Sequence, residues 1–304
     1  MRIVFFGTPE FARVSLDYLY SQNRNIVAVF TQADKPRNRG MKVSYTPVKE
    51  SALLHNTPVY QPAALRDGGV IEILKQLQCD IILVVAYGKL LPVDVLNFPK
   101  YGCINIHASL LPKYRGAAPI QHAILTGESE TGVTAQYMDE KMDEGDIIKV
   151  SKSPVLPDET SVSLREKLSV LGAKLLDDTI SDIADGVSVR TKQNHADATY
   201  APLLTKQMSP INWNNTAHQI DCQIRGLIAW PTATMEFGGK TLKVFSAAVT
   251  DNINCGEPGT IIACDKRGIE IACADLSILI KEVQAAGGKR MSASDYLKGN
   301  PYEI

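Results

Sequence analysis

The sequence of 304 residues contains no long hydrophobic run. Its longest strongly apolar stretches, such as residues 81–86, fall far short of the roughly 20 residues that span a bilayer. The N-terminus also lacks the ordered cationic, apolar and small-residue segments of a signal peptide. These absences exclude a membrane-spanning helix and predict a protein that stays in the cytoplasm.

Motifs that pair cysteines are also missing. The six cysteines include no Cys-x-x-Cys pair, so we expect free thiols in a reducing compartment rather than a disulfide framework. The four-residue spacing of His218 and Cys222 places both on one helical face, as in some zinc sites. Two ligands without a further cluster nearby do not complete a site, so we predict no metal.

Neither sign of charge is in excess. The 32 lysines and arginines against 33 acidic residues give a net charge of −1, which excludes a global attraction to polyanions. The distribution of charge along the chain is nevertheless uneven. Residues 35–49 contain five cations and no acid, together with Pro36, Gly40 and Pro47, so we expect a basic surface loop there.

The glycine fingerprint of a dinucleotide-binding fold is absent as well. The first apolar stretch leads into Gly7-Thr8-Pro9-Glu10-Phe11, which does not have the Gly-x-Gly-x-x-Gly spacing. Those glycines allow the backbone to approach a pyrophosphate, so we do not expect a nicotinamide dinucleotide cofactor. Thr8 and Pro9 suit the N-cap and the first position of a helix.

The first half of the chain alternates short apolar runs with segments of helical periodicity. This pattern predicts an α/β fold with a parallel, doubly wound sheet. The expected strands are residues 2–6, 26–30, 81–86, 103–107 and 131–137, and the expected helices are residues 10–20, 70–78 and 119–126. The last part of the chain predicts a helix followed by a small barrel of short strands, at residues 216–226, 232–237, 241–249, 260–263 and 269–273.

A polar, turn-rich segment separates the two patterns. Before it, a long helix near residues 164–183 is expected to close the first domain, with a capping box from Ser163 to Glu166. We therefore predict a first domain of residues 1–189, a linker of residues 190–206 and a second domain of residues 207–304.

A candidate site begins in the predicted strand 103–107. Asn105 and His107 are two residues apart, so they project together near the carboxyl end of a parallel strand, where open α/β sheets build sites. Asp143 lies in a later loop expected at the same edge, and its carboxylate can orient and charge the imidazole. No Ser or Cys is spaced to act as a nucleophile beside these three residues. The set therefore favours direct group transfer with oxyanion stabilisation over a covalent enzyme intermediate.

The residues around this set resemble a known family. Asn105-x-His107, the string His107-x-Ser-Leu-Leu-Pro-x-x-x-Gly116 and Asp143 are similar to the catalytic set of the 10-formyltetrahydrofolate-dependent formyltransferases. Further strings resemble the branch of this family that modifies initiator tRNA, and the similarity covers nearly the whole chain. These strings are Gly7-Thr8-Pro9-Glu10-Phe11-Ala12, Val85-Ala86-Tyr87-Gly88, Tyr114-Arg115-Gly116-Ala117-Ala118-Pro119-Ile120, Ile224-Arg225-Gly226 and Trp230-Pro231.

The resemblance implies a Rossmann-like catalytic domain followed by a smaller, OB-like β-barrel domain that binds tRNA. Asn105, His107 and Asp143 would catalyse transfer of a formyl group from 10-formyltetrahydrofolate to the α-amino group of methionine on initiator tRNA, a step in translation initiation. Asn105 and His107 would donate to the oxyanion, and Asp143 would hold His107 and help to move a proton. The donor is an activated amide and a cosubstrate, so no metal is needed.

The resemblance also assigns binding residues. The folate pocket would be formed by backbone groups of Ala86, Tyr87, Gly88, Ser109, Leu110, Leu111 and Pro112. The tRNA would be contacted by Lys35, Arg37, Arg39 and Lys42, and the protein would act as a monomer. Residues 207–304 contain nine lysines and arginines against ten acidic residues, which departs from the basic face expected of a tRNA-binding domain.

Three other functions remain open at this point. A formyltransferase acting on a small amine, such as an amino-sugar nucleotide or glycinamide ribonucleotide, would share the same three residues but have little use for the basic loop. A non-catalytic protein that only binds tRNA or folate is also possible on this fold, but it would not need Asn105, His107 and Asp143 together. A nicotinamide-dependent dehydrogenase would need the glycine fingerprint, which this sequence lacks.

Overall fold

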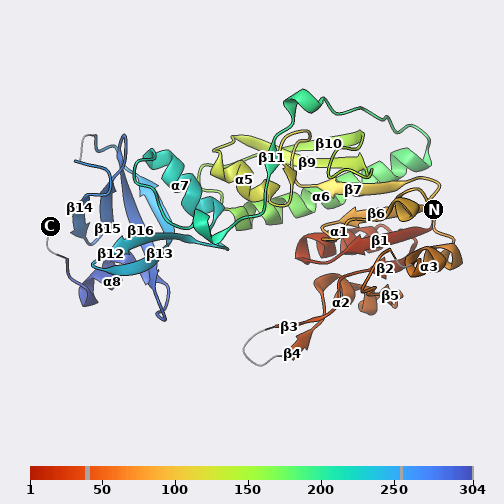
Figure 1. Ribbon diagram of the computed structural model, residues 1–304, viewed down its shortest axis with the longest axis horizontal. Coiled ribbons are helices and arrows are strands. Elements are labelled where there is room, and N and C mark those ends of the chain that lie inside the picture. Colours follow the sequence, from red (N-terminus) through yellow and green to blue (C-terminus); the bar gives the residue numbers. More distant parts are fainter. Residues whose placement is uncertain (38–41, 67, 254–255, 303–304) are drawn as a thin grey trace. The chain divides into compact units, whose positions relative to one another are not determined.

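The computed structural model describes residues 1–37, 42–66, 68–253 and 256–302 (Figure 1). The chain divides into two compact units, each drawn from more than one stretch of sequence. The first contains residues 1–116, 130–154 and 165–201, and the second contains residues 117–129, 155–164 and 202–304. The segment expected as a linker is therefore shared, with residues 190–201 in the first unit and residues 202–206 in the second.

The first unit is built on a seven-stranded sheet in the order β10-β9-β7-β6-β1-β2-β5. Its strands are β1 (Ile3–Gly7), β2 (Ile26–Phe30), β5 (Val59–Tyr60), β6 (Ile81–Val85), β7 (Cys103–His107), β9 (Glu130–Tyr137) and β10 (Ile147–Pro154). Strands β5, β2, β1, β6 and β7 run parallel, as predicted. The parallel direction does not extend to β9, which is antiparallel to both β7 and β10.

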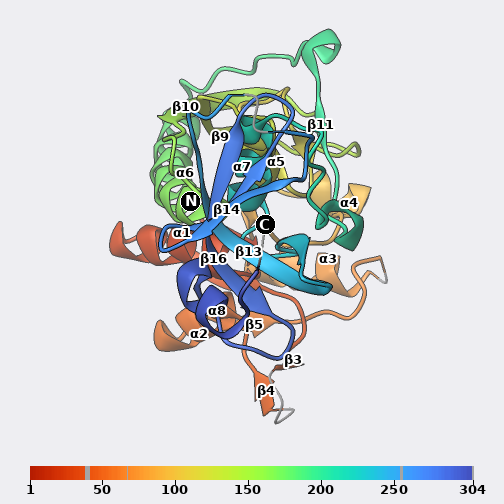
Figure 2. The same ribbon diagram turned by 90° about the vertical axis from the view of Figure 1, so that its left-hand side faces the viewer.

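Helices cover both faces of this sheet (Figure 2). On one face, α3 (Gly69–Leu77) and α4 (Val93–Leu96) join Phe6 and Phe30 in a buried cluster. On the other face lie α1 (Glu10–Ser21) and α6 (Ser161–Ala184). Gly172 of α6 lets this helix approach Ile106, because a Cβ there would lie 3.0 Å from the Ile106 side chain. The predicted doubly wound α/β class is confirmed.

Two helix starts differ from the sequence-based prediction. The N-cap of α1 is Pro9, and the Thr8 hydroxyl instead donates to the carbonyl oxygen of Tyr87 at 3.1 Å. The α6 capping hydroxyl belongs to Thr160, which accepts from the backbone N–H of Ser163 at 3.2 Å while its own N–H donates to Ser163 Oγ at 3.0 Å. The box expected from Ser163 to Glu166 is therefore wrong by about one turn.

The second unit contains a six-stranded antiparallel sheet in the order β12-β13-β16-β15-β14, with β17 paired to β16. Helix α7 begins after Thr216, which forms a capping box with Gln219, and its Ile220 and Ile224 join the buried core. The predicted second, smaller β domain is confirmed, and its strands form an antiparallel sheet. Its elements are α5 (Pro119–Leu125), α7 (Ala217–Gly226), β12 (Ala233–Phe237), β13 (Lys240–Val249), β14 (Ile261–Asp265), β15 (Gly268–Ala272), β16 (Ser277–Ala285), β17 (Met291–Ser292) and α8 (Ala293–Gly299).

Five cysteines lie within the described residues and are free thiols, while Cys255 lies outside them. The Cys222 sulfur lies 3.6 Å from His218 Nε2 and accepts from Arg225 Nη2 at 3.3 Å. Burial raises the pKa of the Cys222 thiol. In the described ranges, no three His, Cys, Asp or Glu side chains are grouped to hold a metal. A helix that is both long enough and apolar enough to cross a membrane is also not found in those ranges.

Candidate active site

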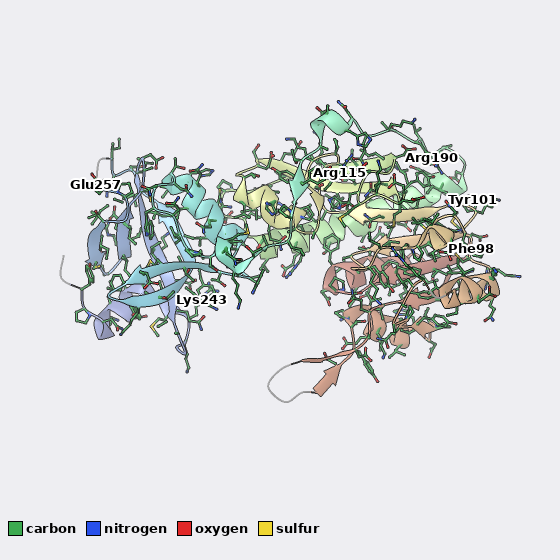
Figure 3. The ribbon with its side chains drawn as sticks, viewed as in Figure 1. Phe98, Tyr101, Arg115, Arg190, Lys243 and Glu257 are labelled. Atoms are coloured by element: carbon green, nitrogen blue, oxygen red, sulfur yellow. The ribbon has the colours of Figure 1, made fainter. Side chains whose placement is uncertain are left out.

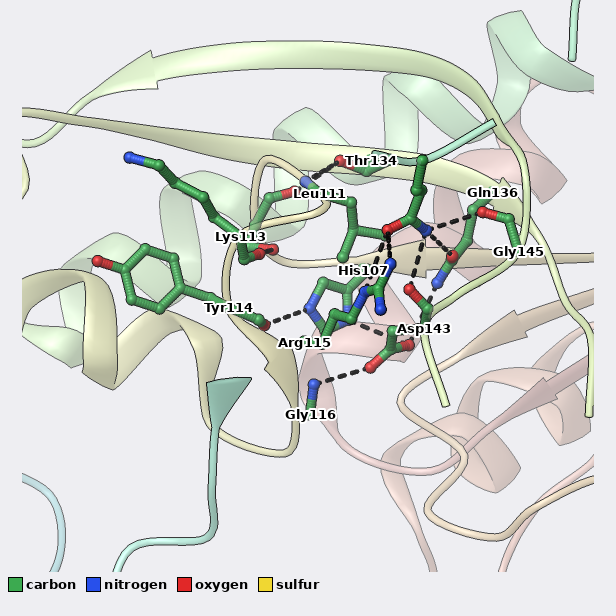
Figure 4. A network of polar contacts seen from close by, with 12 residues as sticks. His107, Leu111, Lys113, Tyr114, Arg115, Gly116, Thr134, Gln136, Asp143 and Gly145 are labelled. Carbon is green, nitrogen blue, oxygen red and sulfur yellow. Dashed lines mark hydrogen bonds and ion pairs between the residues drawn. The ribbon is translucent and has the colours of Figure 1, made fainter. Parts of the chain in front are cut away.

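The candidate site lies at the carboxyl end of β7 (Figure 4). This strand pairs with β6 and β9, which places Asn105 opposite Val84 on one side and Gln136 on the other. Ile106 points toward α6, so Asn105 and His107 project together from the opposite face of the sheet. His107 is 6% exposed and Asn105 is half-buried. The strand thus delivers an amide and an imidazole to one place.

Asp143 reaches this place from the loop between β9 and β10. Its Oδ1 lies 3.5 Å from Nδ1 of His107 and accepts from Nε2 of Gln136 at 3.2 Å. Its Oδ2 accepts from the backbone N–H of Gly116 at 2.9 Å. These contacts hold Asp143 with a left-handed φ of 57°, which is uncommon for residues other than glycine. The structure therefore brings together the predicted carboxylate and imidazole.

The His107 ring lies between two acceptors. Its Nε2 is 2.8 Å from the carbonyl oxygen of Tyr114, and a carbonyl oxygen only accepts hydrogen bonds. Nε2 therefore carries a proton, while Nδ1 faces the Asp143 carboxylate. The two neighbours fix the orientation of the ring, with the Tyr114 carbonyl at one nitrogen and the Asp143 carboxylate at the other. Such a group is suited to stabilising negative charge and to relaying a proton.

The turn after β6 presents its backbone rather than its tyrosine. Ala86 and Gly88 are exposed and have left-handed φ angles of 46° and 81°. Tyr87 between them is 1% exposed, and its ring meets the edge of Phe6 at a centroid distance of 5.1 Å. Its carbonyl oxygen accepts from Gln32 Nε2 at 2.9 Å. The Tyr87 side chain therefore belongs to the core, and only its backbone remains for the predicted contact with folate.

The Tyr87 hydroxyl provides a stability prediction. Among the described residues it is buried without a hydrogen-bond partner, and burial raises the pKa of Tyr87 to about 12. Tyr87→Phe is expected to raise the free energy of unfolding by about 1 kcal/mol, because an unpaired buried hydroxyl is removed. The control is Tyr20→Phe, which removes a hydroxyl that donates to Thr57 at 2.6 Å and should cost about 1 kcal/mol. An equal loss in the free energy of unfolding for both variants, measured by urea unfolding, would contradict this interpretation.

Residues 109–112 form the turn that leaves β7. The Thr134 hydroxyl of β9 donates to the carbonyl oxygen of Ser109 at 2.7 Å and accepts from the N–H of Leu111 at 3.1 Å. Leu110 and Pro112 remain partly exposed. Because β6 and β7 are parallel neighbours, this turn and residues 86–88 lie at the same edge of the sheet.

Two parts of the segment predicted as a basic surface loop are paired strands, and residues 38–41 between them lie outside the described residues. Its strands β3 (Lys35–Arg37) and β4 (Lys42–Ser44) form an antiparallel hairpin, in which Arg37 lies opposite Lys42. This pairing satisfies peptide groups that a loop would leave to water. Arg39 lies outside the described residues. Lys49, in α2 (Pro47–Leu54), pairs with Asp34 at 2.5 Å.

The sequence matches the formyl transferase family over residues 1–180 and the C-terminal domain of formyl transferases over residues 203–301. The chain belongs to the formyl transferase family. It is 47% identical to a protein of Trichlorobacter lovleyi named methionyl-tRNA formyltransferase, over 100% of this chain and 95% of that protein. It is 46% identical to a protein of Alkaliphilus oremlandii with the same name, over 100% of this chain and 98% of that protein.

Solved structures of other formyl transferases share the fold. A sugar 3N-formyl transferase, solved in the presence of dTDP and 5-N-formyl-THF, gives a TM-score of 0.71 at 20% identity, covering 95% of this chain and 99% of that chain. An N-formyltransferase of Helicobacter canadensis, solved with folinic acid and dTDP-3-aminofucose, gives a TM-score of 0.67 at 20% identity. The match covers 93% of this chain and 98% of that chain. At these identities the likeness concerns the fold alone.

Sequence reasoning missed three buried polar side chains behind Asp143. In this formyl transferase, Arg115 (labelled in Figure 3) is 1% exposed, and its Nη1 lies 3.3 Å from Glu144. Gln136 is 1% exposed, and Gln193 is 7% exposed. Arg115 stands in a string that resembles the family, which is a usable signal. Gln193 stands in a polar stretch without periodicity, where the sequence offers no signal of burial.

Proposed function

We propose that this chain transfers a formyl group from 10-formyltetrahydrofolate to the α-amino group of methionine esterified to initiator tRNA, for translation initiation. The observation that carries the proposal is the identity of 46–47%, over the full length of this chain, to proteins named methionyl-tRNA formyltransferase. The pairing of His107 with Asp143 at the end of β7 supports it with suitable chemistry.

In the proposed reaction, the amine attacks the formyl carbon and the formyl oxygen gains negative charge. The Asn105 amide donates to that oxygen, and His107 turns its Nε2–H from the Tyr114 carbonyl to the same oxygen, an interaction worth about 3 to 4 kcal/mol per donor in comparable sites. The amine nitrogen loses a proton and N10 of the folate gains one when the C–N10 bond breaks. Asp143 holds the imidazole and takes part in this proton transfer.

The folate is proposed to bind at the sheet edge formed by the turns after β6 and β7. Ala86 and Gly88 are exposed there, and their left-handed backbone leaves peptide groups accessible to the edge of a heterocycle. Leu110 and Pro112 supply apolar contact, while Ser109 and Leu111 are fixed through Thr134. We propose that these peptide and apolar groups together contact the folate.

For the tRNA, we propose that Lys35, Arg37, Arg39 and Lys42 contact phosphates. Residues 207–304 form the proposed tRNA-binding domain and residues 1–189 the catalytic one, acting as a monomer in the cytoplasm. Because the second domain has no excess of basic residues, the hairpin carries most of the proposed electrostatic attraction.

Neutralising these four cations is expected to weaken tRNA binding and its dependence on salt. At about 0.9 per phosphate contact, the slope of log affinity against log salt should flatten by up to about 3.6. Folate binding should hardly change. Filter binding of methionyl-tRNA at several salt concentrations measures the slope. An unchanged slope would show that the hairpin is ordinary solvated surface.

The function itself is tested by supplying the protein with 10-formyltetrahydrofolate, labelled in the formyl group, and charged initiator tRNA. We expect labelled N-formylmethionine after hydrolysis of the ester. Absence of label on methionine, while a small amine such as an amino-sugar nucleotide becomes labelled, would replace the proposal with the small-amine alternative.

A further inference from the structure

Residues 190–201, expected as part of a linker, pack along the candidate site. Thr191 and Ile147 exchange two backbone hydrogen bonds of 2.8 Å. Farther on, the carbonyl oxygen of Thr199 accepts from the N–H of Arg115 at 2.8 Å, and its hydroxyl accepts from the N–H of Tyr114 at 2.9 Å. The strands β8 (Arg115–Gly116) and β11 (Tyr200–Ala201) then pair in parallel. Both ends of the segment are thereby tied to the first unit.

Gln193 is the buried centre of this segment. Its Nε2 donates to the carbonyl oxygens of Asp143 and Gly145, both at 2.8 Å, and lies 3.2 Å from Oε1 of Gln136. Its Oε1 accepts from Nε and Nη2 of Arg115, at 3.1 and 2.7 Å. One amide therefore joins the Asp143 loop to β8.

These contacts lead to both neighbours of the His107 ring. On one side, Gln193 holds the backbone of Asp143, whose left-handed φ needs support from its surroundings. On the other side, Gln193 binds Arg115, the residue that follows Tyr114, and the Tyr114 carbonyl accepts from the imidazole. Releasing Gln193 loosens the carboxylate and the carbonyl that together fix the ring.

We propose that Gln193 is a positioning residue for formyl transfer. It holds Asp143 and the Tyr114 carbonyl at the separation that orients the His107 ring, and it acts through them. The inference rests on the proposed function of the same site. Misplacement of a reacting group by about 1 Å can cost about a hundredfold in rate, so a positioning role affects kcat more than substrate binding.

Gln193→Glu is the first test variant. The carboxylate keeps the size of the side chain and the acceptor for Arg115, but it removes the N–H groups that hold Asp143 and Gly145. With both substrates saturating, we expect kcat to fall at least about tenfold, while both KM values stay within about threefold. Gln193→Asn withdraws a neutral amide by about 1.5 Å, one C–C bond, and should lower kcat similarly.

A matched control is available in the same unit. Gln61 also donates to a backbone carbonyl, that of Gln32 at 2.8 Å, and to Asp34 at 2.9 Å, and it accepts from Lys49 at 2.8 Å. Gln61→Glu therefore removes two donors and keeps a cationic partner. It is expected to leave kcat within about twofold of wild type, whatever its thermal unfolding temperature.

The inference is overturned if both Gln193 variants keep kcat within about twofold, if Gln61→Glu loses as much kcat, or if KM rises at unchanged kcat. The wild-type assay separates this result from the proposed function. If wild type formylates a different amine and not methionyl-tRNA, the proposed function fails. The same comparison on that amine still supports or overturns the role of Gln193.

Discussion

His107→Ala is expected to lower kcat for formyl transfer at least about a hundredfold while the protein stays folded. The ring is the only part of the side chain that meets both Tyr114 and Asp143, so its loss removes a donor to the oxyanion and the partner of the carboxylate. Single-turnover transfer to methionyl-tRNA measures the loss. Asn105→Ala and Asp143→Ala should show losses of the same order.

A histidine outside the site provides the control for this prediction. His55 bonds to the carbonyl of Ser51 at 3.0 Å and stacks on Tyr20, away from β7. His55→Ala should keep kcat within about twofold of wild type, although stability falls. A folded His107→Ala protein with near-normal turnover would be incompatible with the assignment of His107.

Gly145→Ala is expected to have the second large effect. A Cβ at this position would lie 1.8 Å from the carbonyl oxygen of Tyr137, so the backbone must move. The same residue accepts from Gln193, and Asp143 stands two residues earlier. We expect the free energy of unfolding to fall by about 3 kcal/mol, as for severe overpacking, and kcat to fall about a hundredfold.

Gly299→Ala is the stability control, since nothing lies within 4 Å of a Cβ there. At the end of α8 this change should leave the free energy of unfolding unchanged or raise it by up to about 1 kcal/mol. Guanidinium unfolding, followed by circular dichroism, measures both variants. The interpretation of the Asp143 loop is wrong if Gly145→Ala matches wild type in both stability and turnover.

Much of the site follows from local rules. The side-chain period of a strand places Asn105 and His107 on one face, and the parallel order of the sheet places the turns after β6 and β7 at one edge. These rules need only the sequence of each segment and the class of fold. The edge expected for the Asp143 loop is wrong, because β9 is antiparallel to β7 and the loop after Tyr137 starts beside Ile104, near the amino end of β7. Asp143 reaches His107 from that end of the strand.

Other features depend on contacts between distant segments. Gln193 is buried because its amide meets Arg115 and the Asp143 loop, and neither partner is visible from the polar sequence around it. Thr8 is drawn away from its expected capping role by the carbonyl of Tyr87. The antiparallel direction of β9 is set by its pairing with β7, which the alternation of strands and helices does not specify.

The choice of acceptor is measured in a competition between two amines. Wild-type protein, limiting 10-formyltetrahydrofolate, methionyl initiator tRNA and an amino-sugar nucleotide are mixed, and both formylated products are quantified. We expect methionyl-tRNA to be preferred by at least about a hundredfold in kcat/KM. The rate of transfer should depend on His107, and the salt dependence of the preference should depend on the basic hairpin. Equal labelling of the two acceptors, or preference for the nucleotide, would contradict the expected preference.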